Sequence, residues 1–340
     1  MRTETSSVAA LSPPENLRHG LRLALAPWIV FSLGLLGYLQ LAFIGSVFAA
    51  LFALGLKPVP VSYGISLLTK SAAILLLSWG LSIWLLPYPV VFLIVVCVGV
   101  LLAYRLQIKT GDMLLSVFAV IAALLVPYLV RTGPELAGQI AFWLIANVSV
   151  AMIVSWLVFL LLPDATLVEA TSDKEVADDT SYDVERRMFR LVVIVIPFVF
   201  CAFVFDFITP FVLVFVAIQS SQFVADTSVQ GRATQDMLIA NAIGGIGAIM
   251  IYELMVAVPF LPFILVVSLA AMIWFSHRFI NGDVRMVSAI TAFLILLGGT
   301  LMPFSDDAQT KMVFRLWQLG IAFAYLSFAF AIVDRFVPEK

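Results

Sequence analysis

The stretch that decides the fold is the first apolar run, LALAPWIVFSLGLLGYLQLAFIGSVFAALFALGL, which covers residues 23–56. It contains no charged residue, so it can lie in the hydrocarbon core of a membrane. As one helix it would be about 51 Å long, whereas the core of a bilayer is about 30 Å thick. We therefore predict a break at GYLQ, residues 37–40, which divides the run into two short membrane spans.

The composition of the 340-residue chain excludes a water-soluble protein. Hydrophobic residues make up 63% and charged residues 12% of the chain, against about 50% and about 25% in soluble domains. The net charge of −2 excludes a basic nucleic-acid-binding protein. Cys97 and Cys201 lie in apolar runs and are expected to be buried, without a disulfide or a metal. The two histidines, His19 and His277, are too few for a histidine-based metal site.

Similar apolar runs recur along the chain and predict an all-α polytopic membrane protein with about twelve transmembrane helices. The predicted spans are 23–38, 40–56, 64–86, 89–104, 112–130, 138–162, 191–206, 208–224, 236–258, 260–276, 286–303 and 313–333. Residues 1–17, which include Pro13 and Pro14, are expected to be a disordered cytoplasmic tail. The polar residues 163–187 are expected to be a cytoplasmic linker between two sets of six spans.

The positions of the basic residues agree with this number of spans. If both termini lie in the cytoplasm, all but three of the nineteen Lys and Arg residues also lie on the cytoplasmic side; the exceptions are Arg131, Lys311 and Arg315. This asymmetry is the one that the positive-inside rule describes. It predicts a multi-pass protein of a bacterial inner membrane with both termini in the cytoplasm.

The two sets of spans share features at a nearly constant offset, which predicts an internal repeat. The matching pairs, 170 to 173 residues apart, are Pro27 and Pro197, Pro89 and Pro262, Arg105 and Arg278, and Asp112 and Asp283. We predict a first membrane repeat over residues 18–162 and a second over 188–338. The two repeats would be parallel, because each contains an even number of spans. Chance similarity between two Leu-, Val- and Phe-rich segments is the alternative interpretation.

The chain carries none of the motifs of soluble enzymes that we sought: a P-loop, a GxGxxG after a strand, HExxH or CxxC. We therefore expect a protein that is not an enzyme and that uses no cofactor or metal. Hydrolysis of ATP would require a separate ATPase subunit.

Polar side chains inside the apolar runs are the first candidate functional residues, because charge is costly at membrane depth. Lys70, in the third predicted span, and Arg232, at the start of the ninth, could attract a carboxylate. Together with Asn241 they are the predicted substrate-binding residues. Lys70 could instead extend to the membrane interface. Asn241, like Asn147, could instead join neighbouring helices.

Two acidic residues, Asp206 and Glu253, are the predicted proton-coupling residues. A carboxylate in a cavity of low dielectric constant can bind a proton near neutral pH. The inward proton gradient could then drive an anion outward. In the alternative interpretation, Asp206 lies in a periplasmic turn and Glu253 faces water at the outer end of its span.

An arginine and an aspartate recur between the fourth and fifth spans of each set, as Arg105 and Asp112 in the first and Arg278 and Asp283 in the second. Each pair is a candidate gate on the cytoplasmic side. The alternative is that the two arginines only fix the orientation of the spans. The glycine-rich IGGIG, residues 243–247, is expected to allow close helix packing.

Three features together resemble a known family. Each set of spans opens with arginines, in LRHGLRLALAPW and RRMFRLVVIVIP; a Gly-Arg element, QGRATQD, precedes IGGIG; and the turns read YRLQIKTGD and HRFINGD. Over residues 18–335 this layout resembles the fusaric-acid-resistance family of inner-membrane proteins, which includes the p-hydroxybenzoate exporters. The chain departs from the larger exporters because only residues 163–187 stand in place of their long cytoplasmic domain.

The resemblance implies export of small, aromatic or other, organic acids beside a periplasmic membrane fusion protein. We therefore expect a proton-driven efflux transporter that is surrounded by lipid, with its site between the two repeats near the membrane midplane. A permease subunit of an ABC complex and a non-transporting membrane scaffold are the alternatives. A homo-oligomer is compatible with the sequence.

Overall fold

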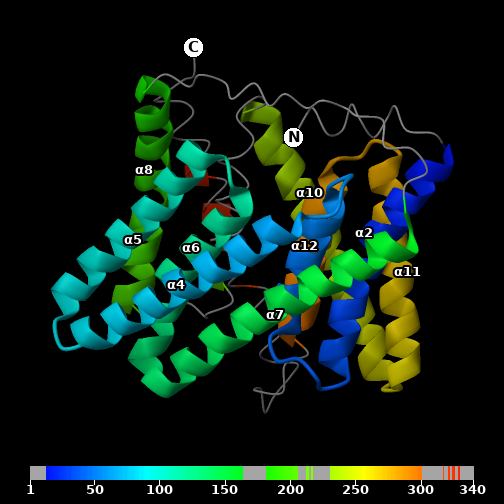
Figure 1. The fold of residues 1–340 in the computed structure, drawn as a ribbon, viewed down its shortest axis with the longest axis horizontal. Helices are drawn as coiled ribbons and strands as arrows, with labels where there is room; N and C mark the ends of the chain where they lie inside the picture. The colour runs from blue at the N-terminus through cyan, green and yellow to red at the C-terminus, as the bar shows by residue number, and fades with distance from the viewer. Residues whose placement is uncertain are drawn as a thin grey trace. The chain divides into compact units, whose positions relative to one another are not determined.

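The computed structural model describes residues 13–163, 181–205 and 230–300, together with positions 212, 213, 216, 317, 321, 324, 325, 328 and 329. All regular secondary structure in this described part is α-helical, as Figure 1 shows. The prediction of an all-α chain is therefore confirmed for these residues.

The helices are α2 (Pro13–Leu35), α3 (Ala42–Leu54), α4 (Val61–Leu85), α5 (Pro89–Thr110), α6 (Met113–Thr132), α7 (Pro134–Leu161), α8 (Ser181–Phe205), α10 (Gln230–Ala257), α11 (Leu261–Ile280) and α12 (Arg285–Thr300). Each of these ten helices overlaps one of the predicted spans. The two remaining spans, 208–224 and 313–333, lie largely outside the described residues.

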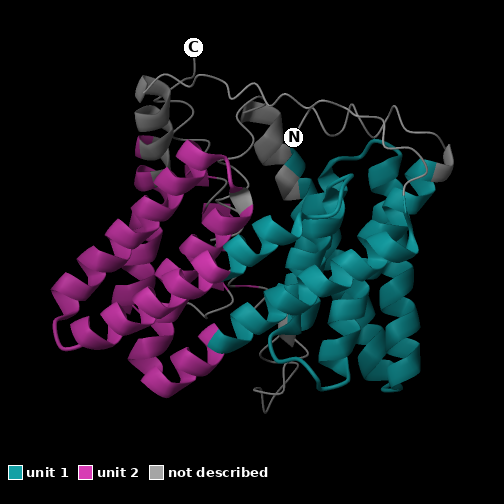
Figure 2. Ribbon diagram, in the orientation of Figure 1, with its two compact units in different colours: residues 1–68, 142–169, 235–309 teal, residues 69–141, 170–234, 310–340 magenta. Residues whose placement is uncertain are grey.

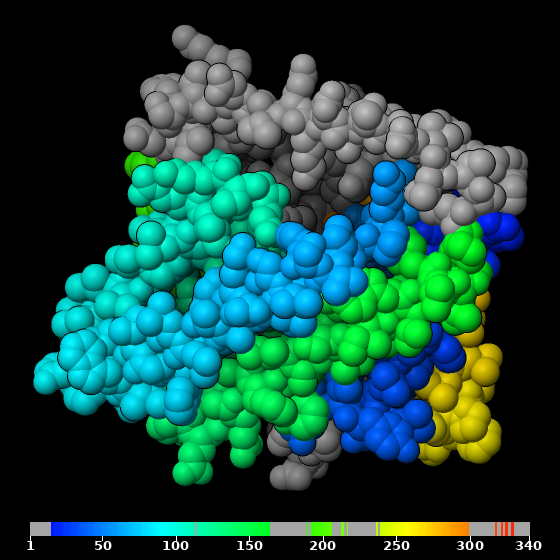
Figure 3. All heavy atoms as spheres, viewed as in Figure 1, coloured from blue at the N-terminus to red at the C-terminus, as the bar shows by residue number. Residues whose placement is uncertain are grey.

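Six of the described helices are long and apolar enough to cross a membrane: α4, α5, α6, α7, α10 and α11. In the most apolar window of α6, 83% of the residues are buried, against 22% in α4 and 28% in α5. The outer surface of α4 and α5, light blue to cyan in Figure 3, carries exposed large apolar side chains such as Leu77, Trp84 and Val90. Because water-soluble proteins rarely expose so much apolar surface, the structure agrees with a membrane protein.

The turn between α2 and α3 confirms the predicted break of the first apolar run. Residues 36–41 leave the helical conformation, and Gly37 (φ +82°) and Leu41 (φ +59°) adopt left-handed backbone angles. Gly34 lies directly against Ala42, so α3 folds back along α2. The corresponding break predicted for the second half, at Asp206 and Pro210, lies outside the described residues.

Two helices begin earlier than the apolar runs that they contain. α2 starts at Pro13, inside the segment 1–17 that we expected to be disordered, and α8 starts at Ser181, inside the expected linker 163–187. For α2 the reason is local: prolines are favourable in the first turn of a helix, and Glu15 there is stabilised by the helix dipole.

The two motifs that were predicted to be equivalent turns both join consecutive helices. YRLQIKTGD ends α5, and its Gly111 has φ +65° before Asp112 caps α6 by accepting a hydrogen bond from Leu115 N (3.1 Å). HRFINGD ends α11, and its Gly282 has φ +96° before Asp283 leads into α12. Glycine at these positions allows the left-handed conformation without strain.

The chain divides into two compact units, shown in different colours in Figure 2. Unit 1 consists of residues 1–68, 142–169 and 235–309, and unit 2 of residues 69–141, 170–234 and 310–340. In unit 1, α3 and α11 each contact both α2 and α12. In unit 2, α5 contacts α6 and α8. Each unit therefore combines segments from both sides of the polar residues 163–187.

Asn147 of α7 connects elements inside unit 1. Its Nδ2 donates to Gln40 O (2.6 Å) in the turn before α3 and to Trp143 O (2.7 Å), and the residue is fully buried. Gly45 of α3 faces this amide: a Cβ added there would lie 2.8 Å from Asn147 Oδ1. Asn147 therefore has a structural role, as one of the two interpretations predicted, but its hydrogen bond to Gln40 O joins α7 to the turn before α3 and not to another helix.

Candidate functional site

Arg22 of α2 is a fully buried cation in unit 1. Its side chain is 0% exposed, and its Cζ atom lies 4.6 Å from the centre of the Phe159 ring on α7. Its Nη1 donates to Leu56 O, just after α3, at 3.4 Å. A cation over an aromatic face is stabilised more strongly when water is excluded. Arg22 therefore brings together α2, the end of α3 and the end of α7.

The residues before Arg22 on α2 reach the ends of two other helices of unit 1. Arg18, one turn earlier, donates from Nη1 to Pro163 O (2.9 Å), just after α7. His19 is fully buried, and its ring centre lies 6.0 Å from that of Phe279 near the end of α11. We call this region the charged end of unit 1; it comprises Arg18, His19, Arg22, Asp236, Asp283 and Arg285.

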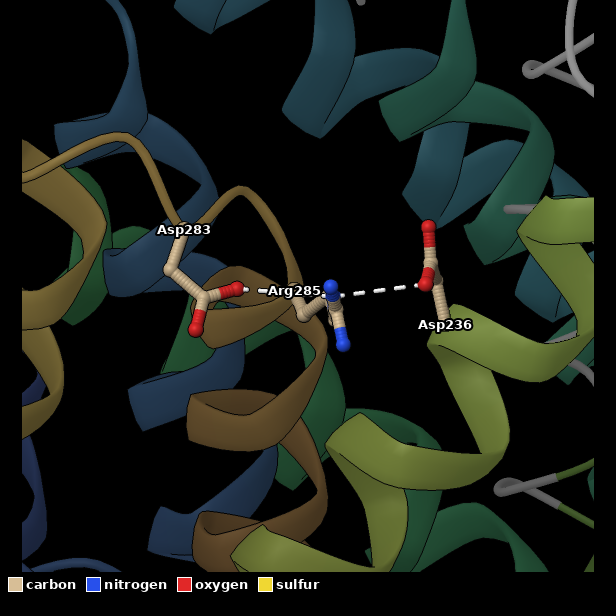
Figure 4. Close-up of polar contacts among 3 residues, drawn as sticks. All are labelled: Asp236, Asp283 and Arg285. Carbon is tan, nitrogen blue, oxygen red and sulfur yellow. Dashed lines mark ion pairs between the residues drawn. The ribbon is translucent and has the colours of Figure 1, made fainter.

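An ion-pair group links α10 and α12 at the charged end, as Figure 4 shows. The Nε atom of Arg285, the first residue of α12, lies 3.3 Å from Asp236 Oδ1 on α10 and 3.6 Å from Asp283 Oδ1. The three side chains are 27% to 45% exposed. Exposed ion pairs are worth about 0–1 kcal/mol, so the group contributes little to the stability of unit 1.

Close packing of α10 on α12 follows from the glycine-rich segment. A Cβ added at Gly244 would strike the backbone carbonyl of Ala289 on α12. A larger residue would push the two helices apart, because the atom it meets belongs to the backbone. This contact confirms the expectation that residues 243–247 allow close helix packing.

The structure gives the predicted gate residues other contacts. Asp112 serves as the N-terminal cap of α6, and Arg105 is exposed on α5. In the second motif, the partner seen for the Asp283 carboxylate is Arg285, whereas the guanidinium of Arg278 lies over the Trp274 ring, 5.9 Å from its centre. Arg285 and Asp236 therefore form the observed link between helices at the place where we predicted an Arg278–Asp283 pair.

The structure describes three of the predicted substrate and proton residues, and within unit 1 it separates Asn241 from Glu253. Lys70 is exposed on α4 in unit 2; in unit 1, Asn241 is half-buried and Glu253 is exposed, both on α10. Twelve residues of helix place Asn241 and Glu253 about 18 Å apart along the axis. Arg232 lies in the first turn of α10, but its side chain is outside the described residues, as is all of Asp206.

Sequence reasoning missed Arg22 and His19 as candidate functional residues, because it treated the arginines before the first span only as markers of orientation. A signal was present in the spacing: Arg18 and Arg22 are four residues apart and so share one face of a helix. That face continues into the buried residues Ala26 and Val30 (both 0% exposed), four and eight residues after Arg22.

In the part of the chain that the structure describes, no group of three or more His, Cys, Asp or Glu residues is placed to hold a metal. Both cysteines are free and half-buried, less buried than we expected. Comparisons of the chain with protein-family models, with curated proteins and with solved structures find no match.

Proposed function

We propose that the chain is a transporter of a bacterial inner membrane that exports small organic acids, aromatic ones included, in exchange for protons. The observation that carries the proposal is the complete burial of Arg22 against Phe159 of α7, a helix that is long and apolar enough to span a membrane. An ionisable residue buried in a membrane protein points to a functional site, because burying its charge is costly. A guanidinium beside an aromatic ring suits an aromatic carboxylate, which presents a negative charge next to an apolar ring.

The proposal assigns roles to the residues singled out in the sequence. Lys70, Arg232 and Asn241 attract and hold the carboxylate as it arrives from the cytoplasmic side. Asp206 or Glu253 exchanges protons on the periplasmic side. A periplasmic membrane fusion protein receives the solute, as the family resemblance implies.

The proposed transporter has twelve membrane helices in two repeats. Ten helices are described, and the equivalent turns at Gly111 and Gly282 support the repeat because each joins the corresponding pair of helices, α5 to α6 and α11 to α12. The segments 208–224 and 313–333 supply the remaining two spans. Both termini and residues 163–187 lie in the cytoplasm.

Transport by everted membrane vesicles tests the function, with p-hydroxybenzoate as the probe. We expect vesicles that contain the chain to accumulate the probe when their interior is acidified and to lose this uptake when the proton gradient is collapsed. Arg22→Gln should reduce the rate about tenfold or more, which corresponds to the loss of about 1.4 kcal/mol of interaction. Arg22→Lys should retain part of the rate, because it keeps the charge without the planar group.

Lys109→Gln is the control, because Lys109 is an exposed basic residue in the last turn of α5 that is assigned no role in transport. It should leave uptake near the unmodified rate at equal protein abundance. Equal rates for Arg22→Gln and Lys109→Gln, or uptake of the probe that is the same in vesicles without the chain, would contradict the proposed function.

A further inference from the structure

The two compact units are composed of equivalent parts of the two chain halves. Unit 1 contains residues 1–68, 142–169 and 235–309, and unit 2 contains 69–141, 170–234 and 310–340. Adding 170, the separation of Pro27 from Pro197, to the first two segments of unit 1 gives 171–238 and 312–339. Subtracting 170 from the third gives 65–139. These shifted segments coincide with those of unit 2 to within a few residues.

Helix contacts follow the same exchange. In unit 1, α2 of the first half packs on α11 of the second half, and in unit 2, α8 of the second half packs on α5 of the first half. By the repeat offset, α8 corresponds to α2 and α5 to α11. The contact of α2 with α11 and the contact of α8 with α5 therefore join equivalent helices, with the first and second halves interchanged. A chance similarity of two apolar halves predicts no such correspondence.

Side-chain contacts in unit 1 join the halves at both α2 and α3. Trp28 Nε1 on α2 donates to Leu265 O on α11 (2.9 Å), and Gly20 lies against Ile280 at the other end of the same helix pair. A Cβ added at Gly298 of α12 would strike Phe43 of α3.

Unit 2 joins the halves around Phe203 of α8. Arg131 Nη1 on α6 donates to Phe203 O (2.7 Å), and the Phe203 ring meets Tyr128 edge to face with ring centres 5.9 Å apart. Phe92 of α5 contacts the same ring, with centres 6.2 Å apart. One aromatic residue of the second half is therefore surrounded by three residues of the first.

We propose that the two halves of this chain are interlocked repeats. The opening helices of each half belong to the compact unit that contains the fourth and fifth helices of the other half. The partner of the α2–α3 surface is then the α11–α12 surface of the second repeat, and the partner of α8 is the α5–α6 surface of the first. Each half therefore buries part of its apolar surface against the other half. The inference rests on the two repeats of the proposed function but requires no transport.

The test uses the full chain with a protease site inserted between Asp173 and Lys174, in the polar segment. Cys97 and Cys201 are first replaced by Ala. Two cysteine pairs that span the halves are then introduced separately, Trp28→Cys with Leu265→Cys in unit 1 and Tyr128→Cys with Phe203→Cys in unit 2. The purified protein is treated with a flexible bis-methanethiosulfonate crosslinker, cut with the protease and run on a denaturing gel.

We expect each spanning pair to hold most of the cut chain at full length until reductant is added. The control pair, Ser78→Cys with Ala122→Cys, lies within one half, where Ser78 Oγ donates to Ala122 O (2.7 Å). It should consume its thiols yet let the halves separate. Full-length product from only one unit, or from neither, while the control pair reacts, would overturn the interlocked arrangement.

A second variant covers the case in which a cysteine pair does not fold. Gly298→Val, which forces a side chain onto Phe43 of the other half, should make the cut halves dissociate at a lower temperature than the unmodified cut protein. Gly80→Val, where no atom lies within 4 Å of the added Cβ, should not. Equal dissociation of the two variants would argue against the interlock. Crosslinks in both units, together with no uptake of the probe by vesicles that contain the unmodified chain, would instead overturn only the proposed function.

Discussion

The contact between Arg22 and Phe159 predicts a measurable coupling energy. Arg22→Met and Phe159→Leu each remove one partner of the contact and change the side-chain volume little. Together with the double variant they form a thermodynamic cycle that measures the interaction energy of the pair. Because Arg22 is 0% exposed and its Cζ lies 4.6 Å from the ring centre, we expect a coupling of about 1–2 kcal/mol in the free energy of unfolding in detergent.

Arg278 and Trp274 provide the comparison cycle for this measurement, since their separation is larger (5.9 Å) and both residues are exposed. Their coupling should stay below about 0.5 kcal/mol. Similar coupling energies in the two cycles would mean that burial adds nothing to the Arg22 contact.

Residue types and spacing could predict that certain polar groups matter, but not which groups meet. Asn147 was predicted to join helices because a polar amide in a membrane span forms hydrogen bonds with neighbouring segments, and it bonds to Gln40 O in the turn between α2 and α3. The pairing of Asp283 with Arg285, and of Asp236 with the same arginine, depends on how α10 and α12 approach each other, which no local pattern encodes.

The turn between α2 and α3 predicts opposite effects for one substitution at two glycines. Gly37 and Gly80 are both exposed, and a Cβ added at either meets no atom within 4 Å. Gly37 has φ +82°, so Gly37→Ala should destabilise the protein by about 1 kcal/mol. Gly80 lies inside α4, so Gly80→Ala should stabilise it by about 0.5–1 kcal/mol. Unfolding in detergent measures both, and a shift of the same sign in the two variants would contradict the assignment of the turn.

Helices and turns were predictable where the sequence carries a local signal. A bilayer limits the length of a span, so the long run 23–56 had to break, and Gly37 marks where it does. The residues at which helices start were less predictable, because hydropathy identifies only the part of a helix that lies in lipid. The helix α2, for example, extends through polar residues to Pro13. The contacts of α2 with α11 and of α5 with α8 join segments far apart in the sequence, and the order of the spans alone does not give them.

The contacts within unit 1 give the direction of each helix relative to the charged end. α2, α10 and α12 begin there, at Arg18, Asp236 and Arg285, whereas α3, α7 and α11 end there, beside Arg22, Arg18 and His19. In a chain of twelve spans that cross the membrane in alternating directions, the first, ninth and eleventh spans (α2, α10 and α12) must run in one direction. The second, sixth and tenth spans (α3, α7 and α11) must run in the opposite direction. The directions in unit 1 satisfy that requirement.

These directions, with the excess of basic residues at the charged end, predict the side of the membrane on which each turn lies. In a variant without Cys97 and Cys201, a cysteine at Lys57 or at Ser172 should react with an impermeant maleimide only after the inner membrane is opened. A cysteine at Glu135 should react in cells whose inner membrane is intact. Lys57 and Glu135 are both exposed, so a difference between them reflects the side of the membrane and not burial. Labelling of Ser172→Cys from outside would leave an odd number of spans before the linker, and it would remove the twelve-span arrangement together with the parallel repeat.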